Sequence, residues 1–287
     1  MKPHVGVRND IQQAGGVAHR AATSREMTWL ARLGYAIKGV VYVIIGWLAV
    51  QLAIGTGGKA TGRHGALQTV SQQPFGHFLL IVVAVGLLAY ALWSFIQAIY
   101  DTEGAGRSAK GVVQRIAYAA VGVSYALLSF GAFKLVSGAG SSGKNSTAST
   151  QGWTALLLKQ PFGVALVVLV GLIVLGIAVA LFMEAYKMQF LRHLNLSSVN
   201  ATARKVVTFL GRLGYAAQGV VFVIIGLFLI IAAVDRNPGQ AKGLNTALLV
   251  LAQQPFGKFL LAIVALGFLA YGIYSWVEAR YRRVGRA

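Results

Sequence analysis

The stretch Arg32-Leu-Gly-Tyr-Ala-Ile-Lys-Gly-Val-Val-Tyr-Val-Ile-Ile-Gly46 occurs a second time as Arg212-Leu-Gly-Tyr-Ala-Ala-Gln-Gly-Val-Val-Phe-Val-Ile-Ile-Gly226, with 12 of 15 positions identical. A weaker copy begins at Arg115 and keeps Tyr118, Ala119, Gly122 and Val123. It has Ile116-Ala117 where the other two copies have Leu-Gly. Each copy opens a long apolar run. The chain is therefore built from three copies of one unit.

A Pro-Phe-Gly motif recurs once in the second half of each copy. Its residues are Pro74, Phe75, Gly76, Pro161, Phe162, Gly163, Pro255, Phe256 and Gly257. From the proline to a polar residue near the end of each copy, Gln97, Glu184 or Glu278, the distance is always 23 positions. We interpret the motif as a helix start, with proline in the first turn, phenylalanine as an interfacial anchor and glycine allowing close approach. A lipid or partner contact repeated three times is the alternative.

The composition requires lipid around the chain. Hydrophobic residues make up 56% of the 287 residues and charged residues 11%, which leaves too little polar surface for a soluble globule. Six apolar runs occupy residues 39–54, 78–100, 116–133, 160–183, 213–234 and 259–277. With short extensions, each reaches the roughly 17–25 residues that cross a bilayer as a helix. The sequence predicts an all-α membrane protein with six transmembrane helices.

Each copy contains two of these helices, so the three copies enter the membrane in the same orientation. They are expected to form three parallel hairpin repeats with pseudo-threefold symmetry about an axis along the membrane normal. The stretch before each Pro-Phe-Gly, such as residues 245–254, is expected to form a short helix along the outer surface. The expected units are a flexible cytoplasmic tail (1–29), repeat 1 (30–104), repeat 2 (105–190), repeat 3 (191–281) and a basic cytoplasmic C-terminus (282–287).

The basic residues indicate the orientation. Lys and Arg number 26 against 7 acidic residues. Seventeen basic residues lie on the side of both termini and seven on the other, so both termini are expected in the cytoplasm, with the protein in a bacterial cytoplasmic (inner) membrane. The expected partners are membrane lipids, including anionic head groups, and a membrane protein partner or a second copy of the chain. Nucleic acid is not expected, because the basic segments are short and form no reading module.

Chemical motifs are scarce. The chain has no cysteine, which excludes disulfides, thiolate metal sites and iron–sulfur clusters. Its five histidines show neither zinc-ligand spacing nor a mid-span haem pair. There is no phosphate loop and no nucleophile elbow. We therefore expect no cofactor, no metal and no enzymatic activity.

The repeated Arg-x-x-Tyr-Ala-x-x-Gly helix start, followed each time by Gln-Pro-Phe-Gly, resembles the bacterial membrane family called domain of unknown function 1206. The resemblance covers about residues 27–283. It implies a six-span membrane protein in three repeats. It implies no activity, substrate or catalytic residue.

Six polar residues are expected at similar depth near the cytoplasmic interface. They are Arg32, Gln97, Arg115, Glu184, Arg212 and Glu278. Because an arginine fork matches a carboxylate, we expect Arg212–Glu278 and Arg115–Glu184 pairs, with the glutamine of repeat 1 accepting a weaker hydrogen bond from its arginine. An inner vestibule for a polar solute or ion is the alternative.

Two polar residues fall deeper within the spans. Lys38 and its counterpart Gln218 are candidate intramembrane polar residues, and the third counterpart is Val121. The long side chain of Lys38 is expected to snorkel to the cytoplasmic head groups. A charge inside the membrane is also a candidate functional group.

Glycines recur seven positions apart on one helix face. They are Gly39, Gly46, Gly219 and Gly226. Small residues let helices approach closely in lipid, so we interpret them as packing contacts, with a pore lining as the alternative.

Two functional hypotheses follow. The first is a non-enzymatic structural, accessory, partner-binding or lipid-binding bundle. The second is a small transporter or channel with a path near the pseudo-threefold axis. A continuous axial cavity lined by Lys38, Gln218 and the glutamates would favour transport.

Overall fold

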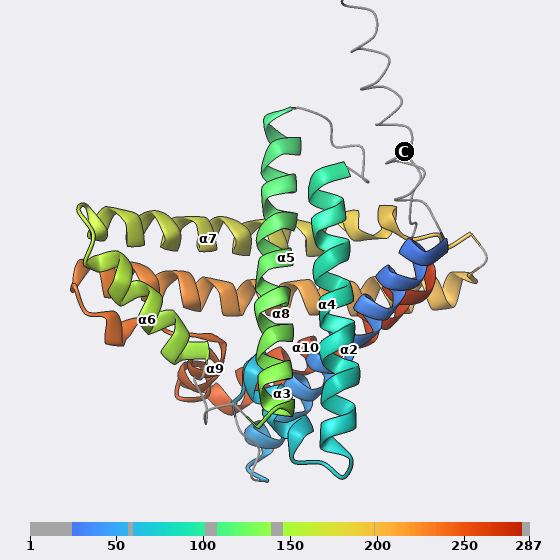
Figure 1. Ribbon diagram of the computed structural model, residues 1–287, viewed down its shortest axis with the longest axis horizontal. Coiled ribbons are helices and arrows are strands. Elements are labelled where there is room, and N and C mark those ends of the chain that lie inside the picture. Colours follow the sequence, from blue (N-terminus) through green and yellow to red (C-terminus); the bar gives the residue numbers. More distant parts are fainter. Residues whose placement is uncertain (1–24, 57–59, 101–107, 139–145, 198, 283–287) are drawn as a thin grey trace, which may run out of the picture.

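The computed structural model describes residues 25–56, 60–100, 108–138, 146–197 and 199–282, and the regular elements among them are all helices (Figure 1). The long helices are α2 (Arg25–Ile54), α4 (Gly76–Tyr100), α5 (Ala109–Val136), α7 (Gly163–Lys187), α8 (Ala201–Val234) and α10 (Gly257–Tyr281). Each contains an apolar window long enough to cross a membrane. This confirms the predicted all-α membrane protein with six transmembrane helices.

Short elements connect the long helices of each hairpin and of neighbouring hairpins. They are α3 (Arg63–Ser71), α6 (Ser146–Leu158), η1 (Gln189–His193), η2 (Pro238–Gln240) and α9 (Leu244–Ala252). The predicted short helix before each Pro-Phe-Gly is therefore present in all three repeats.

The boundaries of the long helices follow from local chemistry. The Ser108 side chain accepts a hydrogen bond from the Gly111 amide at the start of α5, and the Asn200 side chain accepts one from the Ala203 amide at the start of α8. These side chains satisfy amides that have no partner inside the helix. Helix α2 already begins at Arg25, inside the expected tail. Residues 1–24 and 283–287 lie outside the described residues.

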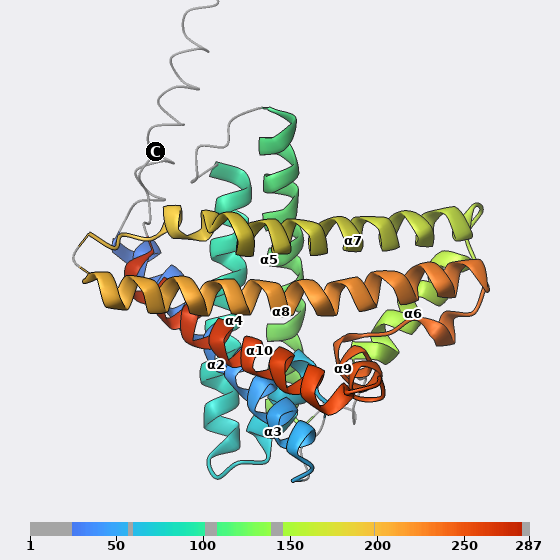
Figure 2. The same cartoon turned by 180° about the vertical axis from the view of Figure 1, so that it is seen from behind.

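The long helices pack in pairs that link different hairpins. Helix α4 packs along α5, α7 packs along α8, and α10 packs along α2 (Figures 1 and 2). The second helix of each hairpin therefore packs against the first helix of the next one, and the last hairpin returns to the first. Within hairpins, α2 also packs on α4, and α8 on α10.

Repeat 2 breaks this cyclic pattern. Its helices α5 and α7 make no extensive contact with each other in the described chain. In Figure 1 the α4–α5 pair runs vertically while the α7–α8 pair runs horizontally, with the α2–α10 pair lying diagonally. The six helices form an open row, in the order α5, α4, α2, α10, α8 and α7. The pseudo-threefold arrangement of equivalent hairpins that the repeats predict is not confirmed.

Glycines explain why repeat 2 differs. A Cβ added at Gly34 of α2 would lie 2.7 Å from the Cα of Tyr90 in α4, and one at Gly214 of α8 would lie 2.8 Å from the Cα of Tyr271 in α10. These glycines allow the two backbones of each hairpin to meet. Repeat 2 has Ala117 at the corresponding position, so its helices cannot approach as closely.

Candidate functional site

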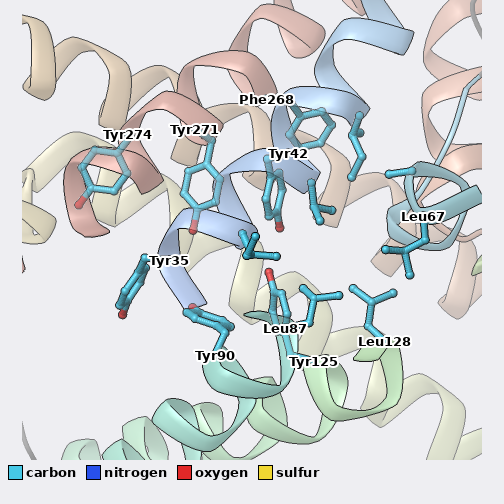
Figure 3. Close-up of a cluster of buried hydrophobic side chains, with 14 of the residues drawn as sticks. Tyr35, Tyr42, Leu67, Leu87, Tyr90, Tyr125, Leu128, Phe268, Tyr271 and Tyr274 are labelled. Carbon is cyan, nitrogen blue, oxygen red and sulfur yellow. The ribbon is translucent and has the colours of Figure 1, made fainter. Parts of the chain in front are cut away.

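Tyrosine rings from four helices gather at the centre of the molecule (Figure 3). The rings of Tyr42 in α2 and Tyr271 in α10 meet edge to face with centroids 4.8 Å apart. Tyr90 in α4 contacts Tyr35 in α2 at 5.1 Å and Tyr125 in α5 at 4.6 Å, again edge to face. Such pairs add about 0.5–1.5 kcal/mol each beyond the burial of their area. They join α2, α4, α5 and α10 and form an aromatic wall around two cations, of which one is buried and one half-buried.

The first buried cation is Lys38. Its Nζ lies 3.1 Å from Oε2 of Glu278 and donates a hydrogen bond of 3.1 Å to the Tyr271 hydroxyl. The rings of Tyr35, Tyr90 and Tyr271 also face the ammonium group, with centroids 4.8, 5.2 and 4.8 Å away. Both partners of the ion pair are almost fully buried. The expectation that Lys38 snorkels to the head groups is wrong, because α10 brings a carboxylate to its own depth.

Glu278 binds a second cation through its other oxygen. Arg282, the residue that follows the last residue of α10, donates from Nη1 to Oε1 at 2.9 Å, and its guanidinium lies 4.8 Å from the Tyr35 ring centroid. The predicted Arg212–Glu278 pair is wrong, since Glu278 is buried with Lys38 and Arg282 while Arg212 is exposed. Glu278 lies where α10 packs along α2, so its main partner comes from the first hairpin.

The predicted pair in repeat 2 is also wrong. Arg115 of α5 donates from Nε to the carbonyl of Ala98 at 2.6 Å and from Nη2 to that of Ile99 at 2.9 Å. These carbonyls belong to the last turn of α4, where a cation is favoured by the helix dipole. Glu184 lies on α7, which does not pack on α5. Arginine and carboxylate therefore sit on opposite arms of the open hairpin.

The remaining members of the predicted inner group are scattered. Arg32 is half-buried with its guanidinium 5.8 Å from the ring centroid of Trp29, Gln97 is buried, and Glu184 is half-buried. The structure thus places these six residues on different helix pairs and does not gather them into a single ring.

The second cation is Arg63, the half-buried first residue of α3, which the sequence identifies only as one of the seven basic residues on the side away from the termini. Its guanidinium donates from Nη2 to the Tyr42 hydroxyl at 3.1 Å and from Nη1 to the Ser124 hydroxyl at 3.2 Å. Its Cζ lies 5.0 Å from the ring centroid of Tyr125. One feature of the sequence could have identified Arg63, namely a difference between the repeats. The corresponding residue before the third Pro-Phe-Gly is the apolar Leu244.

Arg63 reaches far into the bundle. Its partner Tyr42 lies twelve residues before the end of α2 at Ile54, or about 18 Å along the helix axis. Leu67 of α3 and Leu248 of α9 are completely buried. The expected position of these short helices along the outer surface stays a prediction. Helices α3 and α9 bury one face among the spanning helices, where irregular backbone is shielded from lipid.

A cavity of about 260 Å³ adjoins Arg63. Its lining comes from seven helices and comprises Tyr42, Arg63, His64, Ser124, Leu128, Ser149, Gln218, Val221, Phe222, Ile225, Leu244 and Phe268. Gln218 is 7% exposed, its Oε1 accepts a hydrogen bond of 3.4 Å from the Tyr42 hydroxyl, and its Nε2 has no partner. Lys38 and the glutamates do not line this cavity, so it is not the continuous axial path that the transporter hypothesis predicted.

His64 stands beside Arg63 at the start of α3. Burial, with a smaller contribution from Arg63, lowers the pKa of His64 below its ordinary value of 6.5. The imidazole is therefore largely neutral at pH 7, when it donates from one nitrogen and accepts at the other. Within the described parts of the chain, no three His, Cys, Asp or Glu residues lie together as metal ligands.

A basic groove of about 820 Å³ lies between α7 and the start of α8. Arg204, Lys205 and Arg212 of α8 line it and are exposed. Phe182 and Phe209 contribute apolar surface to the same groove. Its lining therefore combines cations with an apolar wall.

A family model described as Domain of Unknown Function (DUF1206) matches the chain three times, at residues 33–101, 116–188 and 213–282. The chain belongs to this family. It is 37% identical to the uncharacterized protein YxxB of Bacillus subtilis (strain 168) over 253 residues, which cover 88% of this chain and 90% of the relative. No solved structure matches the chain.

Each DUF1206 segment contains one Gln-Pro-Phe-Gly turn. The glycine amide donates to the glutamine carbonyl in all three, at 2.8 Å (Gly76 to Gln73), 2.9 Å (Gly163 to Gln160) and 2.7 Å (Gly257 to Gln254). The phenylalanines have φ of 62°, 61° and 59°. A proline at the second position of the turn and a positive φ at the third position are the pattern of a type II turn. The proline therefore precedes the long helix, which begins at the glycine, and its predicted place in the first helical turn is wrong.

The turn phenylalanines adopt a conformation that normally favours glycine. A left-handed conformation costs a residue with a Cβ about 1–2 kcal/mol. Phe75, Phe162 and Phe256 are nevertheless 85%, 86% and 86% exposed, so packing inside the chain does not compensate. The repeated strain is consistent with the predicted interfacial anchor, in which the ring contacts lipid or a partner.

We expect Phe256→Gly to raise the free energy of unfolding by up to about 1 kcal/mol, because glycine adopts a positive φ without strain. Phe259→Gly is the matched control: Phe259 is also exposed but lies inside α10, where glycine should cost about 1 kcal/mol. Thermal unfolding in detergent measures both. A loss of stability in Phe256→Gly equal to that of the control would show that the ring, and not the turn conformation, dominates.

Proposed function

We propose that the protein is a non-enzymatic bundle of the cytoplasmic membrane that binds anionic phospholipid in the groove between α7 and α8. Both termini lie in the cytoplasm in this proposal, in agreement with the excess of basic residues on their side. The bundle serves as a structural or accessory element whose lipid-facing helices also meet a membrane partner. The observation that carries the proposal is the combination of cations and apolar surface in one groove.

The groove matches the two parts of a phospholipid. Arg204 and Arg212 lie two helical turns apart on the same face of α8, and Lys205 lies beside them. Each contributes about 1 kcal/mol of attraction to an anionic membrane surface. The phosphate is placed at these cations, and the acyl chains follow Phe182 and Phe209 along the pair of helices.

Helix α7 offers a large surface for the acyl chains. Only 17% of the residues in its apolar window are buried inside the protein. Its packing partner among the long helices is α8, because the α5 arm of the hairpin lies elsewhere. A helix with one packed side needs lipid or another protein on its other sides.

Lipid binding to the purified protein tests the proposal. We expect native mass spectrometry in neutral detergent to show more bound phosphatidylglycerol than phosphatidylcholine. The triple variant Arg204→Gln, Lys205→Gln, Arg212→Gln should lose this preference, with about 100-fold weaker phosphatidylglycerol binding, because three contributions of about 1 kcal/mol are removed. The control variant Lys159→Gln, Arg236→Gln, Lys258→Gln removes three exposed charges predicted for the other membrane side and should keep it. If both variants lost phosphatidylglycerol binding equally, the binding would depend only on the net charge of the protein, and the proposal would be contradicted.

A further inference from the structure

The Arg63 cavity holds a cation without a carboxylate partner. Arg63 contacts the neutral hydroxyls of Tyr42 and Ser124, and the described residues that line the cavity include no Asp or Glu. Leu128, Val221, Ile225 and Phe268 make much of the wall apolar. Arg63 is half-buried, and a cation that is partly removed from water in such surroundings is stabilised when an anion accompanies it.

A second donor lines the same cavity without an acceptor. The Nε2 of Gln218 has no hydrogen-bond partner among the described residues and its side chain is buried, while its Oε1 accepts from the Tyr42 hydroxyl. Tyr42 in turn accepts from Arg63. Arg63, Tyr42 and Gln218 therefore form one hydrogen-bonded chain that ends in an unpaired donor. A buried donor without a partner costs about 1–3 kcal/mol, which an oxyanion in the cavity would recover.

The starts of three short helices also meet the cavity. Arg63 and Leu244 are the first residues of α3 and α9, and Ser149 belongs to the first turn of α6. The N-cap residues of α3 and α9 are Gly62 and Gly243, which give the first turn no side-chain acceptor. Helix starts carry partial positive charge and favour anions.

We propose that this cavity binds a phosphate-type anion, with the Arg63 guanidinium as its charge partner and the Gln218 amide and Ser124 hydroxyl as further donors. These three donors belong to three different helices, α3, α5 and α8, and line the same cavity. An arginine fork matches phosphate oxygens. The volume of about 260 Å³ is several times the share of about 30 Å³ that one water occupies, enough for a phosphate ester. The phosphate is either free or part of a lipid head group, and it occupies a site separate from the α7–α8 groove.

The full-length protein, delipidated in neutral detergent, is titrated with three probes: inorganic phosphate, phosphatidylglycerol, and diacylglycerol, which lacks the phosphate. Thermal unfolding is measured against sodium chloride of equal ionic strength. A rise in Tm with inorganic phosphate supports the proposal with a free anion. A rise with phosphatidylglycerol but with neither inorganic phosphate nor diacylglycerol supports it with a lipid head group. No rise with either phosphate probe overturns it.

Variants assign the site. Arg63→Gln should weaken binding of the effective probe at least about tenfold, because it removes a charged hydrogen-bond donor. Gln218→Val, which installs the residue that repeat 2 has at this position, should also weaken it about tenfold. The matched control Arg236→Gln changes an exposed arginine outside the cavity and should bind normally. Unchanged affinity in Gln218→Val overturns the proposal even if Arg63→Gln does not fold.

The groove variant separates the two sites. The triple change at Arg204, Lys205 and Arg212 should leave the Arg63-dependent rise in Tm intact. If that variant abolishes the rise while Arg63→Gln retains it, phosphate binds at the groove and the cavity proposal fails. If both variants lose only their own binding, both sites exist.

Discussion

We expect Glu278→Gln to lower the free energy of unfolding by about 3–5 kcal/mol, the usual effect of removing one partner of a buried ion pair. The substitution leaves Lys38 buried among aromatic rings without a carboxylate, and Arg282 is a second cation close by. Lys38→Val should cost less, because Glu278 keeps Arg282 as its partner at 2.9 Å. Unfolding of the purified protein by heat or denaturing detergent measures the difference.

The repeats supply the compensating double variant. At the equivalent contact between α4 and α5, the chain has Val121 in place of Lys38 and Gln97 in place of Glu278. Lys38→Val together with Glu278→Gln reproduces that neutral combination and removes both charges of the pair. We expect the double variant to recover at least half of the loss seen in Glu278→Gln. If Glu278→Gln unfolds like the wild type, the buried pair does not hold α2 and α10 together.

The second large effect is expected at Gly272, where α10 packs along α2. A Cβ at this position would lie 2.8 Å from the carbonyl oxygen of Gly39 and 2.9 Å from the amide nitrogen of Val43. Both contacts are backbone atoms, so a side chain can fit only if the helices separate. Gly272→Leu should therefore cost about 3 kcal/mol or more, at or above the upper end for overpacked cores.

Gly176 provides the matched control for that substitution. It lies within α7, and a Cβ there would meet no atom within 4 Å. Gly176→Leu should leave stability unchanged or raise it slightly, since leucine favours a helix over glycine by up to about 1 kcal/mol. Equal losses in Gly272→Leu and Gly176→Leu, measured in the same detergent, would contradict close backbone packing between α2 and α10.

The glycine pattern shows how far sequence reasoning reached into packing. The predicted role of glycines in close packing is supported at Gly39 and Gly46, where an added Cβ would meet α10 within 3 Å, and at Gly219 and Gly226, where it would meet α7. Their spacing on one helix face was sufficient to predict close packing, because helical periodicity depends only on nearby residues in the sequence. The partner helix was not predictable from it.

The charged groups show where such reasoning stops. Lys38 was identified as unusual from its counterparts, but its partner Glu278 was assigned to Arg212. The Arg212–Glu278 pair was predicted because both residues were expected at the same depth in one hairpin. The observed Lys38–Glu278 pair joins the first and last hairpins. Arg63 was counted only among the basic residues on the side away from the termini, and no role was predicted for it. Whether a loop residue lies at the surface or beside Tyr42 depends on the direction in which α3 enters the bundle.

The sequence by itself determined the six apolar spans, the three repeats and the short helices, because hydrophobicity and periodicity act over a few residues. Only the tertiary structure decided that each hairpin packs against the next, that repeat 2 stays open, and that Arg63 and Gln218 meet at one cavity. Those outcomes depend on which helix surfaces fit together across large separations in the chain. Differences between the repeats, such as Ala117 where the other two have glycine, affect that fit while leaving the apolar pattern of the spans intact.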